Sequence, residues 1–392
     1  SLTAHLNRRL FSNKLPFTSG GTVEFERLAP GLGARTVINS RLRNKPIRWI
    51  AGADLSHQRD DRKRFDNNNG IKGSQTLDRF ETVTSIGPYL RAEWQESPRI
   101  ELVAGIRYDH VEFDLEDNFL SDGDQSGSKT LSEWSGTLGA VYHFNKSLHG
   151  YANIATAFET PTTTELATAP SGGSGFNQNL DSQLSVSYEV GLKERIGDRM
   201  DYDLAVFVIQ SWDELIPFEI ITSPGRTFYK NAGQSRRVGL ETAMSFRPVE
   251  RIETGLSYAF SDFRFTRFDD NGSNHSGNFI PGMPEHRIVA NLRADSSSGW
   301  FAKGEIQYVS SFFVNDENTV DNPSYITNRF SFGRKKAVGK SQLSVFLGVE
   351  NIFDQSYNAN TRINATGGRY FEPGQPFTLF GGVSWVYLAA VK

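Results

Sequence analysis

Apolar and polar residues alternate one by one along much of this 392-residue chain. From Ile100 to Tyr108 every second residue is apolar, and the residues between them are mostly polar or small. Side chains of a β-strand point alternately to its two faces, so a period of two predicts strands. The pattern recurs in about fourteen segments after residue 46, with one or two weaker segments at residues 22–27 and 35–41. No segment has a helical period, so the sequence predicts an all-β chain.

The connectors between the predicted strands alternate between short and long. A barrel that crosses an outer membrane has short turns on its periplasmic side and long loops outside. The sequence therefore predicts an antiparallel up-and-down transmembrane β-barrel with extracellular long connectors. The short connectors lie at residues 95–98, 145–147, 197–198, 248–250, 296–299 and 338–340, and the long ones at residues 64–79, 116–132, 159–183, 266–283, 315–323 and 351–376.

The two faces of the predicted strands agree with a barrel. Aromatic residues gather at strand ends, as they do in the interfacial girdles of membrane barrels. The even-numbered residues from Ile100 to Tyr108 are expected to face lipid, and the odd-numbered ones the lumen. Charged residues of the polar faces are too many for the dry core of a soluble domain. They include Glu101, Arg107, Glu189, Lys193, Glu241, Arg293, Lys303 and Glu305.

The composition excludes several other classes of protein. The chain has no cysteine, which excludes disulfides, thiol nucleophiles and cysteine-ligated metals. A net charge of −3 and a pI near 6.2 give no indication of nucleic-acid binding. No uncharged apolar stretch reaches the roughly 18–20 residues that a membrane-spanning helix needs. We also find no signal peptide.

Strand spacing limits the size of the barrel. Each strand with its connector takes roughly 24 residues, so a closed barrel of more than about 16 strands does not fit in this chain. The chain is then either a complete medium-sized barrel or the C-terminal part of a larger one. A start inside strand-like sequence, with no N-terminal globular segment, favours the second alternative.

Several local motifs resemble the C-terminal barrel of TonB-dependent outer-membrane receptors. Each motif alone is weak, but their order and spacing over residues 150–387 make the resemblance specific. They are Phe-Glu-Thr-Pro at 158–161, Asn-Gln-Asn-Leu at 177–180, Ser-Tyr-Glu-Val-Gly-Leu-Lys at 187–193, Asn-Ala-Gly at 231–233, Arg-Val-Gly-Leu-Glu at 237–241, Pro-Glu-His-Arg at 284–287, Val-Glu-Asn-Ile-Phe-Asp at 349–354 and Gly-Gln-Pro at 374–376.

The resemblance implies a barrel of about 22 strands that encloses an N-terminal plug. Neither the plug nor the TonB-contacting box of that family is in this sequence. We therefore expect residues 1–392 to be one outer-membrane barrel portion, covering roughly the last two-thirds of the barrel. The partners that the resemblance implies are outer-membrane lipid, a small-molecule ligand and, through the missing N-terminal part, the TonB-ExbB-ExbD energy-transducing complex. We expect no nucleic-acid partner.

Motifs that would indicate catalysis or metal binding are weak by comparison. The seven histidines form no His-x-x-x-His or Ser/His/Asp arrangement, and the acidic runs lack the spacing of a calcium loop. Haem receptors of this family carry Phe-Arg-Ala-Pro where this chain has Phe158-Glu159-Thr160-Pro161, and a histidine before the next motif that this chain lacks. We expect no enzyme activity, no cofactor, no bound metal and no haem uptake.

The mouth of such a receptor needs aromatic and cationic side chains that can hold an anionic, often aromatic, chelate. By resemblance the expected solute is a ferric siderophore, imported across a Gram-negative outer membrane. Cobalamin, a quinone cofactor such as pyrroloquinoline quinone, or a glycan remain open, and so do a passive porin-like pore and a secreted β-rich enzyme. The candidate ligand-binding residues near extracellular strand ends are Arg226, Tyr229, Lys230, Phe312, Phe313, Arg362, Arg369, Tyr370 and Phe371.

Overall fold

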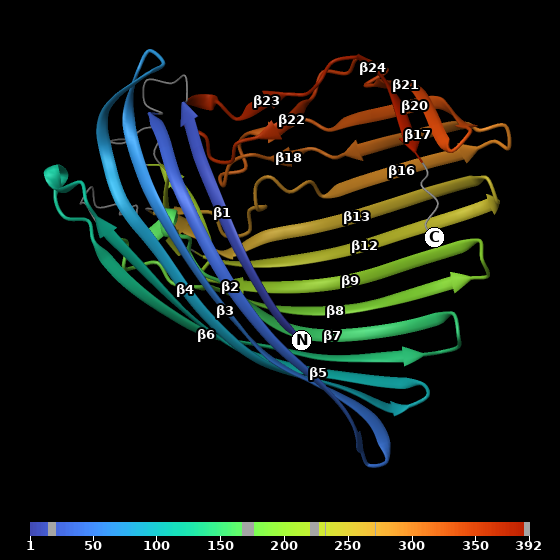
Figure 1. The fold of residues 1–392 in the computed structure, drawn as a ribbon, viewed down its shortest axis with the longest axis horizontal. Helices are drawn as coiled ribbons and strands as arrows, with labels where there is room; N and C mark the ends of the chain where they lie inside the picture. The colour runs from blue at the N-terminus through green and yellow to red at the C-terminus, as the bar shows by residue number, and fades with distance from the viewer. Residues whose placement is uncertain (15–20, 167–175, 220–226, 232, 271, 388–392) are drawn as a thin grey trace. The chain divides into compact units, whose positions relative to one another are not determined.

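The computed structural model describes residues 1–14, 21–166, 176–219, 227–231, 233–270 and 272–387. Sixteen strands form one antiparallel sheet, and their order in the sheet is their order along the chain, with β1 and β24 at its two ends (Figure 1). They are β1 (Leu2–Lys14), β2 (Thr22–Leu42), β3 (Lys45–Asn68), β4 (Ile71–Ser97), β5 (Ile100–Asp117), β6 (Gly127–His143), β7 (Leu148–Glu159), β8 (Gln183–Ile196), β9 (Met200–Trp212), β12 (Gln234–Val249), β13 (Ile252–Arg267), β16 (His286–Asp295), β17 (Trp300–Val309), β20 (Tyr325–Val338), β21 (Ser341–Glu350) and β24 (Thr378–Tyr387).

This order confirms the all-β, up-and-down fold that alternation predicted. Fourteen of the sixteen strands lie from β3 onward, as the sequence indicated. The first two strands differ from the prediction. Residues 22–27 and 35–41 belong to the single strand β2, which passes through Pro30 opposite Leu6 of β1. Its pairing with β3 keeps the same register on both sides of Pro30, so the proline removes a donor without ending the strand. The strand β1 was not predicted.

The predicted long connector at residues 64–79 is wrong. β3 and β4 continue through this region and meet at a two-residue turn, Asn69-Gly70. Both residues have positive φ, 54° and 88°, which is the backbone of a tight hairpin turn. The Asn67 side chain accepts a hydrogen bond from the Gly70 amide at 2.7 Å and fixes the turn. The strands therefore continue up to the Asn69-Gly70 turn, although the polar composition of these residues suggested a loop.

The remaining long connectors carry short elements of their own. Between β9 and β12, residues 213–219, 227–231 and 233 belong to a further long connector, which was not predicted. The connector elements are η1 (Leu120–Asp122), α1 (Thr163–Leu166), β10 (Leu215–Glu219), β11 (Thr227–Asn231), β14 (Asp269–Asp270), β15 (Ser273–Asn274), β18 (Phe312–Phe313), β19 (Asp321–Asn322), β22 (Asn358–Thr361), η2 (Thr366–Gly368) and β23 (Phe371–Pro373). Among the described residues, no helix is long and apolar enough to cross a membrane.

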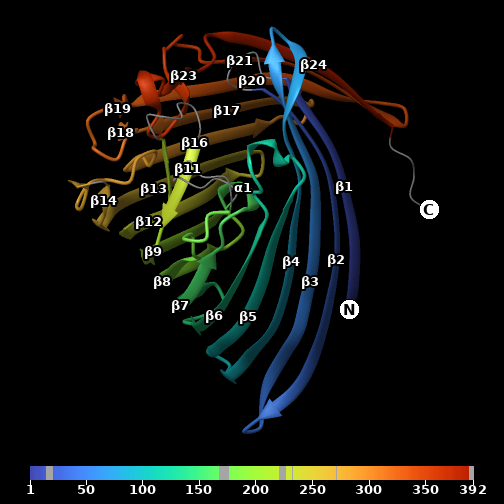
Figure 2. The ribbon, with the colours of Figure 1, turned by 90° about the vertical axis from the view of Figure 1, so that its left-hand side faces the viewer.

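The chain divides into two compact units. The first unit contains residues 1–141, 153–187 and 210–234, and the second contains residues 142–152, 188–209 and 235–392. The buried apolar core of the first unit consists of strand residues and of residues in the connector that follows β7. Figure 2 shows α1, from this connector, beside β4 and β11, against which it lies. The core residues are Phe113, Leu115, Leu131, Leu166, Phe176 and Leu180.

Strands β2 to β5 of the first unit have one apolar and one charged face. Leu32, Leu55 and Ile86 are paired across three strands and are all about half exposed, at 44%, 46% and 46%. Ile106 of β5 is on this apolar face, because it is paired with Leu90 of β4. The alternate positions include the charged side chains of Arg35, Asp54, Arg91 and Arg107. This segregation agrees with the expectation that even-numbered residues of 100–108 face lipid.

Candidate ligand-binding face

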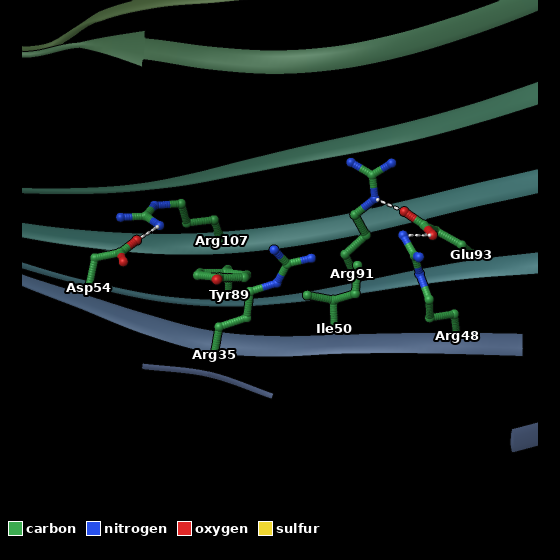
Figure 3. Close-up of a pocket in the computed structure, with 8 residues that line it drawn as sticks. All are labelled: Arg35, Arg48, Ile50, Asp54, Tyr89, Arg91, Glu93 and Arg107. Carbon is green, nitrogen blue, oxygen red and sulfur yellow. Dashed lines mark hydrogen bonds and ion pairs between the residues drawn. The ribbon is translucent and has the colours of Figure 1, made fainter. Parts of the chain in front are cut away.

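The charged face of β2 to β5 contains a hollow of about 580 Å³, which we call the arginine hollow (Figure 3). Its residues come from four neighbouring strands and alternate in sequence with those of the apolar face. Period-two alternation thus brings together side chains that are up to about seventy positions apart in the chain. The hollow is lined by Arg35, Arg48, Ile50, Asp54, Tyr89, Arg91, Glu93 and Arg107.

Three of the four arginines of the hollow form ion pairs. Glu93 pairs with Arg48 at 2.6 Å and with Arg91 at 2.9 Å, and both contacts can be followed in Figure 3. The Arg107 guanidinium reaches Asp54 at 2.9 Å. The four guanidinium groups face the carboxylates of Asp54 and Glu93, and Arg107 also pairs with Asp109 at 2.8 Å, so these groups together have a net charge of +1. Such a hollow favours an anionic partner, since guanidinium groups bind carboxylates and related oxyanions with directed hydrogen bonds.

A second, buried ion cluster lies further along the same charged face. Arg27, Asp60 and Glu81 are paired across β2, β3 and β4, and both carboxylates are 0% exposed. Arg27 donates two hydrogen bonds to Asp60, at 2.8 and 2.7 Å. Arg62 lies 3.1 Å from Glu81 and 3.6 Å from Asp60, and Arg79 also pairs with Glu81. Each buried charge is compensated by a neighbour, as burial requires.

This cluster anchors the connector that follows β7. Thr163, in α1, donates a hydrogen bond from its hydroxyl to Glu81 at 3.1 Å. Three residues further along, Leu166 is 0% exposed and belongs to the core. One polar and one apolar contact therefore hold the start of the connector against the charged face of the sheet. The Phe-Glu-Thr-Pro motif at 158–161 immediately precedes these contacts.

The β10–β11 hairpin of the same unit carries two predicted ligand-binding residues, Tyr229 and Lys230. Tyr229 is half-buried against the core, and its carbonyl accepts a hydrogen bond from the Asn177 side chain at 3.4 Å. Burial, and then the carboxylate of Glu165, raises the pKa of the Tyr229 hydroxyl. The Lys230 ammonium lies 5.0 Å from the ring of Phe218. Arg226, which was predicted with them, lies outside the described residues.

In the second unit, asparagine side chains join three connectors. We call Asn278, Asn318 and Asn364 the asparagine clasp. Asn318 accepts from the Phe279 amide at 2.7 Å and donates to the Phe279 carbonyl at 3.0 Å. Asn278 donates to the Asp316 carbonyl at 2.8 Å. These bonds link the connector after β13 to the connector after β17.

The third connector, after β21, joins the clasp through Asn364. Its side chain accepts from the Asp316 amide at 3.0 Å and donates to the Asp316 carboxylate at 2.8 Å. Its own amide donates to the Val314 carbonyl at 3.0 Å. Asn318 and Asn364 have φ of 56° and 53°, a backbone conformation that asparagine tolerates better than most residues. Burial raises the pKa of Asp316.

The other six predicted ligand-binding residues lie in connectors that the clasp joins. Phe312 and Phe313 form β18 and are half-buried, and the Phe313 ring lies 6.0 Å from that of Phe279. Arg362 is exposed beside the β22–β23 hairpin, and its amide donates to the Tyr370 carbonyl at 2.8 Å. The rings of Tyr370 and Phe371 are 6.0 Å apart. Exposed cationic and aromatic side chains thus gather at this hairpin, namely Arg362, Arg369 and Phe371.

Sequence reasoning missed Arg35 and Arg91 of the arginine hollow and all three clasp asparagines. Of the hollow, only Arg107 was singled out as a lumen residue. The position of Arg35 follows from the continuous β2, which was predicted as two pieces. The clasp has a weak sequence signal, since isolated asparagines in long loops commonly have positive φ and bond to backbone groups.

A family model described as "TonB dependent receptor-like, beta-barrel" matches residues 6–352. The chain therefore belongs to the TonB-dependent receptor-like β-barrel family. Proteins of this family are transport receptors, which agrees with the expectation of no enzyme activity.

Solved structures of receptors and transporters share the fold. The unliganded ferric citrate transporter FecA superimposes with a TM-score of 0.81 at 16% identity, over 98% of this chain and 58% of that one. The ferric yersiniabactin uptake receptor FyuA from Yersinia pestis gives 0.73 at 16% identity, over 98% and 58%. The copper transporter OprC gives 0.73 at 15% identity, over 98% and 61%. The chain thus spans about three-fifths of the length of each.

Proposed function

We propose that this chain is the barrel portion of a TonB-dependent receptor that imports a ferric siderophore across a Gram-negative outer membrane. One observation carries the proposal: exposed Arg362, Arg369 and Phe371 gather at one hairpin, in a connector that the asparagine clasp joins to its neighbours. Cationic and aromatic groups on a preorganised frame suit an anionic, aromatic iron chelate. The net positive charge of the arginine hollow favours the same ligand class. FecA and FyuA, which share the fold, are named for ferric citrate and ferric yersiniabactin.

In this mechanism the connectors capture the chelate, and energy from the TonB-ExbB-ExbD complex drives its passage. No covalent step is required. The coupling acts through an N-terminal plug and TonB-contacting segment, which we propose precede this barrel in the complete receptor. Cobalamin, a quinone cofactor, a glycan and passive porin-like diffusion are the competing functions.

The proposal is tested by uptake of ferric citrate and of a ferric tris-catecholate into iron-limited cells that carry the complete receptor. We expect saturable uptake of one chelate, lost on deletion of either the receptor or TonB. Arg362→Ala should weaken binding of that chelate about tenfold, which is the effect of losing roughly 1.4 kcal/mol. Lys340→Ala, in the short turn between β20 and β21, is the matched control and should bind normally.

Two outcomes would contradict the proposal. Uptake of neither chelate, together with receptor-dependent uptake of cobalamin, would replace the ligand class. Diffusion of small sugars that is independent of TonB would favour the porin-like pore.

A further inference from the structure

Two histidines that the sequence separates by five residues face each other across the β6–β7 hairpin. The Nδ1 atoms of His143 and His149 are 2.7 Å apart. Their ring planes are inclined at 83° with centroids 4.8 Å apart. Both side chains are half-buried, and both belong to the second unit. The contact can form only with one Nδ1 protonated and the other offering its lone pair.

The hairpin turn holds this pair in place. The Asn145 side chain accepts hydrogen bonds from the Ser147 amide at 2.8 Å, the Ser147 hydroxyl at 2.9 Å and the Leu148 amide at 2.9 Å. The Phe144 amide donates to the Leu148 carbonyl at 3.1 Å, so His143 and His149 are the next residues along the two strands. The imidazoles are therefore positioned by the backbone and by a side-chain cap, without a ligand.

The pair lies on the face of β6 and β7 that is opposite to the exposed Phe144. A Cβ at Gly150 would lie 2.9 Å from the Phe144 ring, so the alternate residues His143 and His149 point to the opposite face. Tyr151 follows His149 on that face. The ammonium of Lys193 lies 5.9 Å from the Tyr151 ring and 3.4 Å from the carboxylate of Asp203. The cation beside Tyr151 thus has a carboxylate partner of its own.

We propose that His143 and His149 form a two-imidazole binding site for a divalent transition metal, with Cu²⁺ as the preferred ion. Two nitrogens that each lie about 2.05 Å from a metal are about 2.9 Å apart at a right angle and about 3.3 Å apart at a tetrahedral angle. The observed 2.7 Å is closer to the right angle. Neighbouring ligands at right angles are typical of Cu²⁺ and Ni²⁺, whereas Zn²⁺ prefers the tetrahedron.

When the metal binds, the proton between the two Nδ1 atoms moves to Nε2 of the same ring, so both neutral imidazoles present an Nδ1 lone pair to the ion and the neutral pair releases no net proton. Acid therefore weakens the site, because protons compete for the same lone pairs. Among the described residues, no group of three or more histidine or carboxylate side chains is placed to hold a metal, so water must complete the coordination. The bound ion links β6 to β7 and stabilises the hairpin. The site does not depend on which solute the receptor imports.

The test is titration of the complete, detergent-solubilised receptor with Cu²⁺ alone, followed by calorimetry and electron paramagnetic resonance. We expect one ion bound with two equatorial nitrogen ligands, and a higher melting temperature when Cu²⁺ is present. His143→Gln and His149→Gln should each weaken binding at least tenfold and abolish the two-nitrogen signal. His57→Gln is the matched control, since His57 lies on β3 and bonds only to the Thr84 hydroxyl at 2.9 Å in the described structure. Zn²⁺ should bind at least tenfold more weakly than Cu²⁺.

Unchanged Cu²⁺ affinity in both variants, or no binding at micromolar Cu²⁺, would show that the two histidines share only a hydrogen bond. Circular dichroism of each variant checks that the barrel has folded. A variant that folds poorly is replaced by His149→Asn, which shortens the side chain at the same position. Tighter binding of Zn²⁺ than of Cu²⁺ would overturn the assignment of the preferred metal.

Discussion

The guanidinium of Arg107, on β5, bonds to the carboxylate of Asp54, on β3, at 2.9 Å, although the whole of β4 lies between them. The residue of β4 that is paired with Asp54 is Gly87. A Cβ built at Gly87 would collide with the Arg107 guanidinium and the Asp109 carboxylate. The absence of a side chain at one position therefore allows an ion pair to span three strands.

We predict that Gly87→Val separates Arg107 from Asp54 and changes the shape of the arginine hollow. The Arg107 side chain is 33% exposed and the Asp54 side chain 55%, so solvent screens this ion pair. The loss of stability should therefore be small, about 1 kcal/mol or less. The larger effect is expected on anion binding, measured as the affinity of the receptor for its ferric chelate. Gly136→Ala is the control, because a Cβ there lies 3.4 Å from its nearest neighbour, which is an ordinary contact. Unchanged affinity for Gly87→Val would separate the hollow from ligand binding.

A second prediction concerns the single hydroxyl that joins α1 to the buried ion cluster. Thr163→Ala removes the bond to Glu81 and leaves one oxygen of a fully buried carboxylate without that donor. We expect a loss of about 1.5–3 kcal/mol, the range for hydrogen bonds to charged groups. The connector after β7 should then be cut faster by protease in intact cells. Thr163→Ser keeps the hydroxyl and should behave as the parent. Equal protection in both variants would mean that the apolar contacts of Leu166 alone hold the connector.

The sequence predicted the sheet well because strand alternation is local. The fourteen strands from β3 onward and the separation of their two faces follow from a period of two, and the antiparallel order follows from the alternation of short and long connectors. The failures have local causes as well. The Asn69-Gly70 turn was hidden in a polar run, and β2 was predicted as two weaker segments although it keeps its register on both sides of Pro30.

Side-chain contacts within the candidate sites could not be predicted in the same way. The clasp depends on which connectors meet, and no periodicity specifies that. The histidine pair is an instructive intermediate case. His143 lies three positions before Lys146 and His149 three positions after it. A predicted hairpin at residues 145–147 therefore already implied that the two histidines are cross-strand neighbours. Searching the sequence for helical metal spacings missed this pair, since a hairpin pairs residues by their distance from the turn.

The raised pKa of Asp316 leads to a prediction about pH. The pKa of its carboxyl lies above the ordinary value of 3.8, mainly because the group is buried. The folded state therefore holds this proton more tightly than the unfolded state does. The ionised carboxylate therefore destabilises the clasp at neutral pH, and this cost disappears as the pH falls through the folded pKa towards 3.8. Asp316→Asn removes the charge and keeps an oxygen for the Asn364 amide. We expect the variant to melt at a higher temperature than the parent at pH 7, with the two curves converging in acid.

Asp321→Asn, at an exposed position of the same connector, is the control for this pH dependence. It should follow the parent at every pH. A difference between Asp316→Asn and the parent that does not change between pH 7 and pH 4 would show that burial of the charge is not its cause.

The last prediction tests which face of β5 meets lipid. Ala104 is exposed on the same face as Ile106, whereas Val103 is on the charged face and is paired with Glu93 of β4. An arginine at Ala104 would lie in the hydrocarbon region and should destabilise the barrel by about 2–4 kcal/mol near the bilayer midplane. The matched Val103→Arg substitution introduces the same side chain one residue away, where Glu93 can pair with it, so its cost should be well below that of Ala104→Arg. Unfolding of the two variants in lipid vesicles by urea gives both values. If Val103→Arg proves the more destabilising of the two, the charged face is the one that meets lipid, and the arginine hollow could not be part of a ligand path.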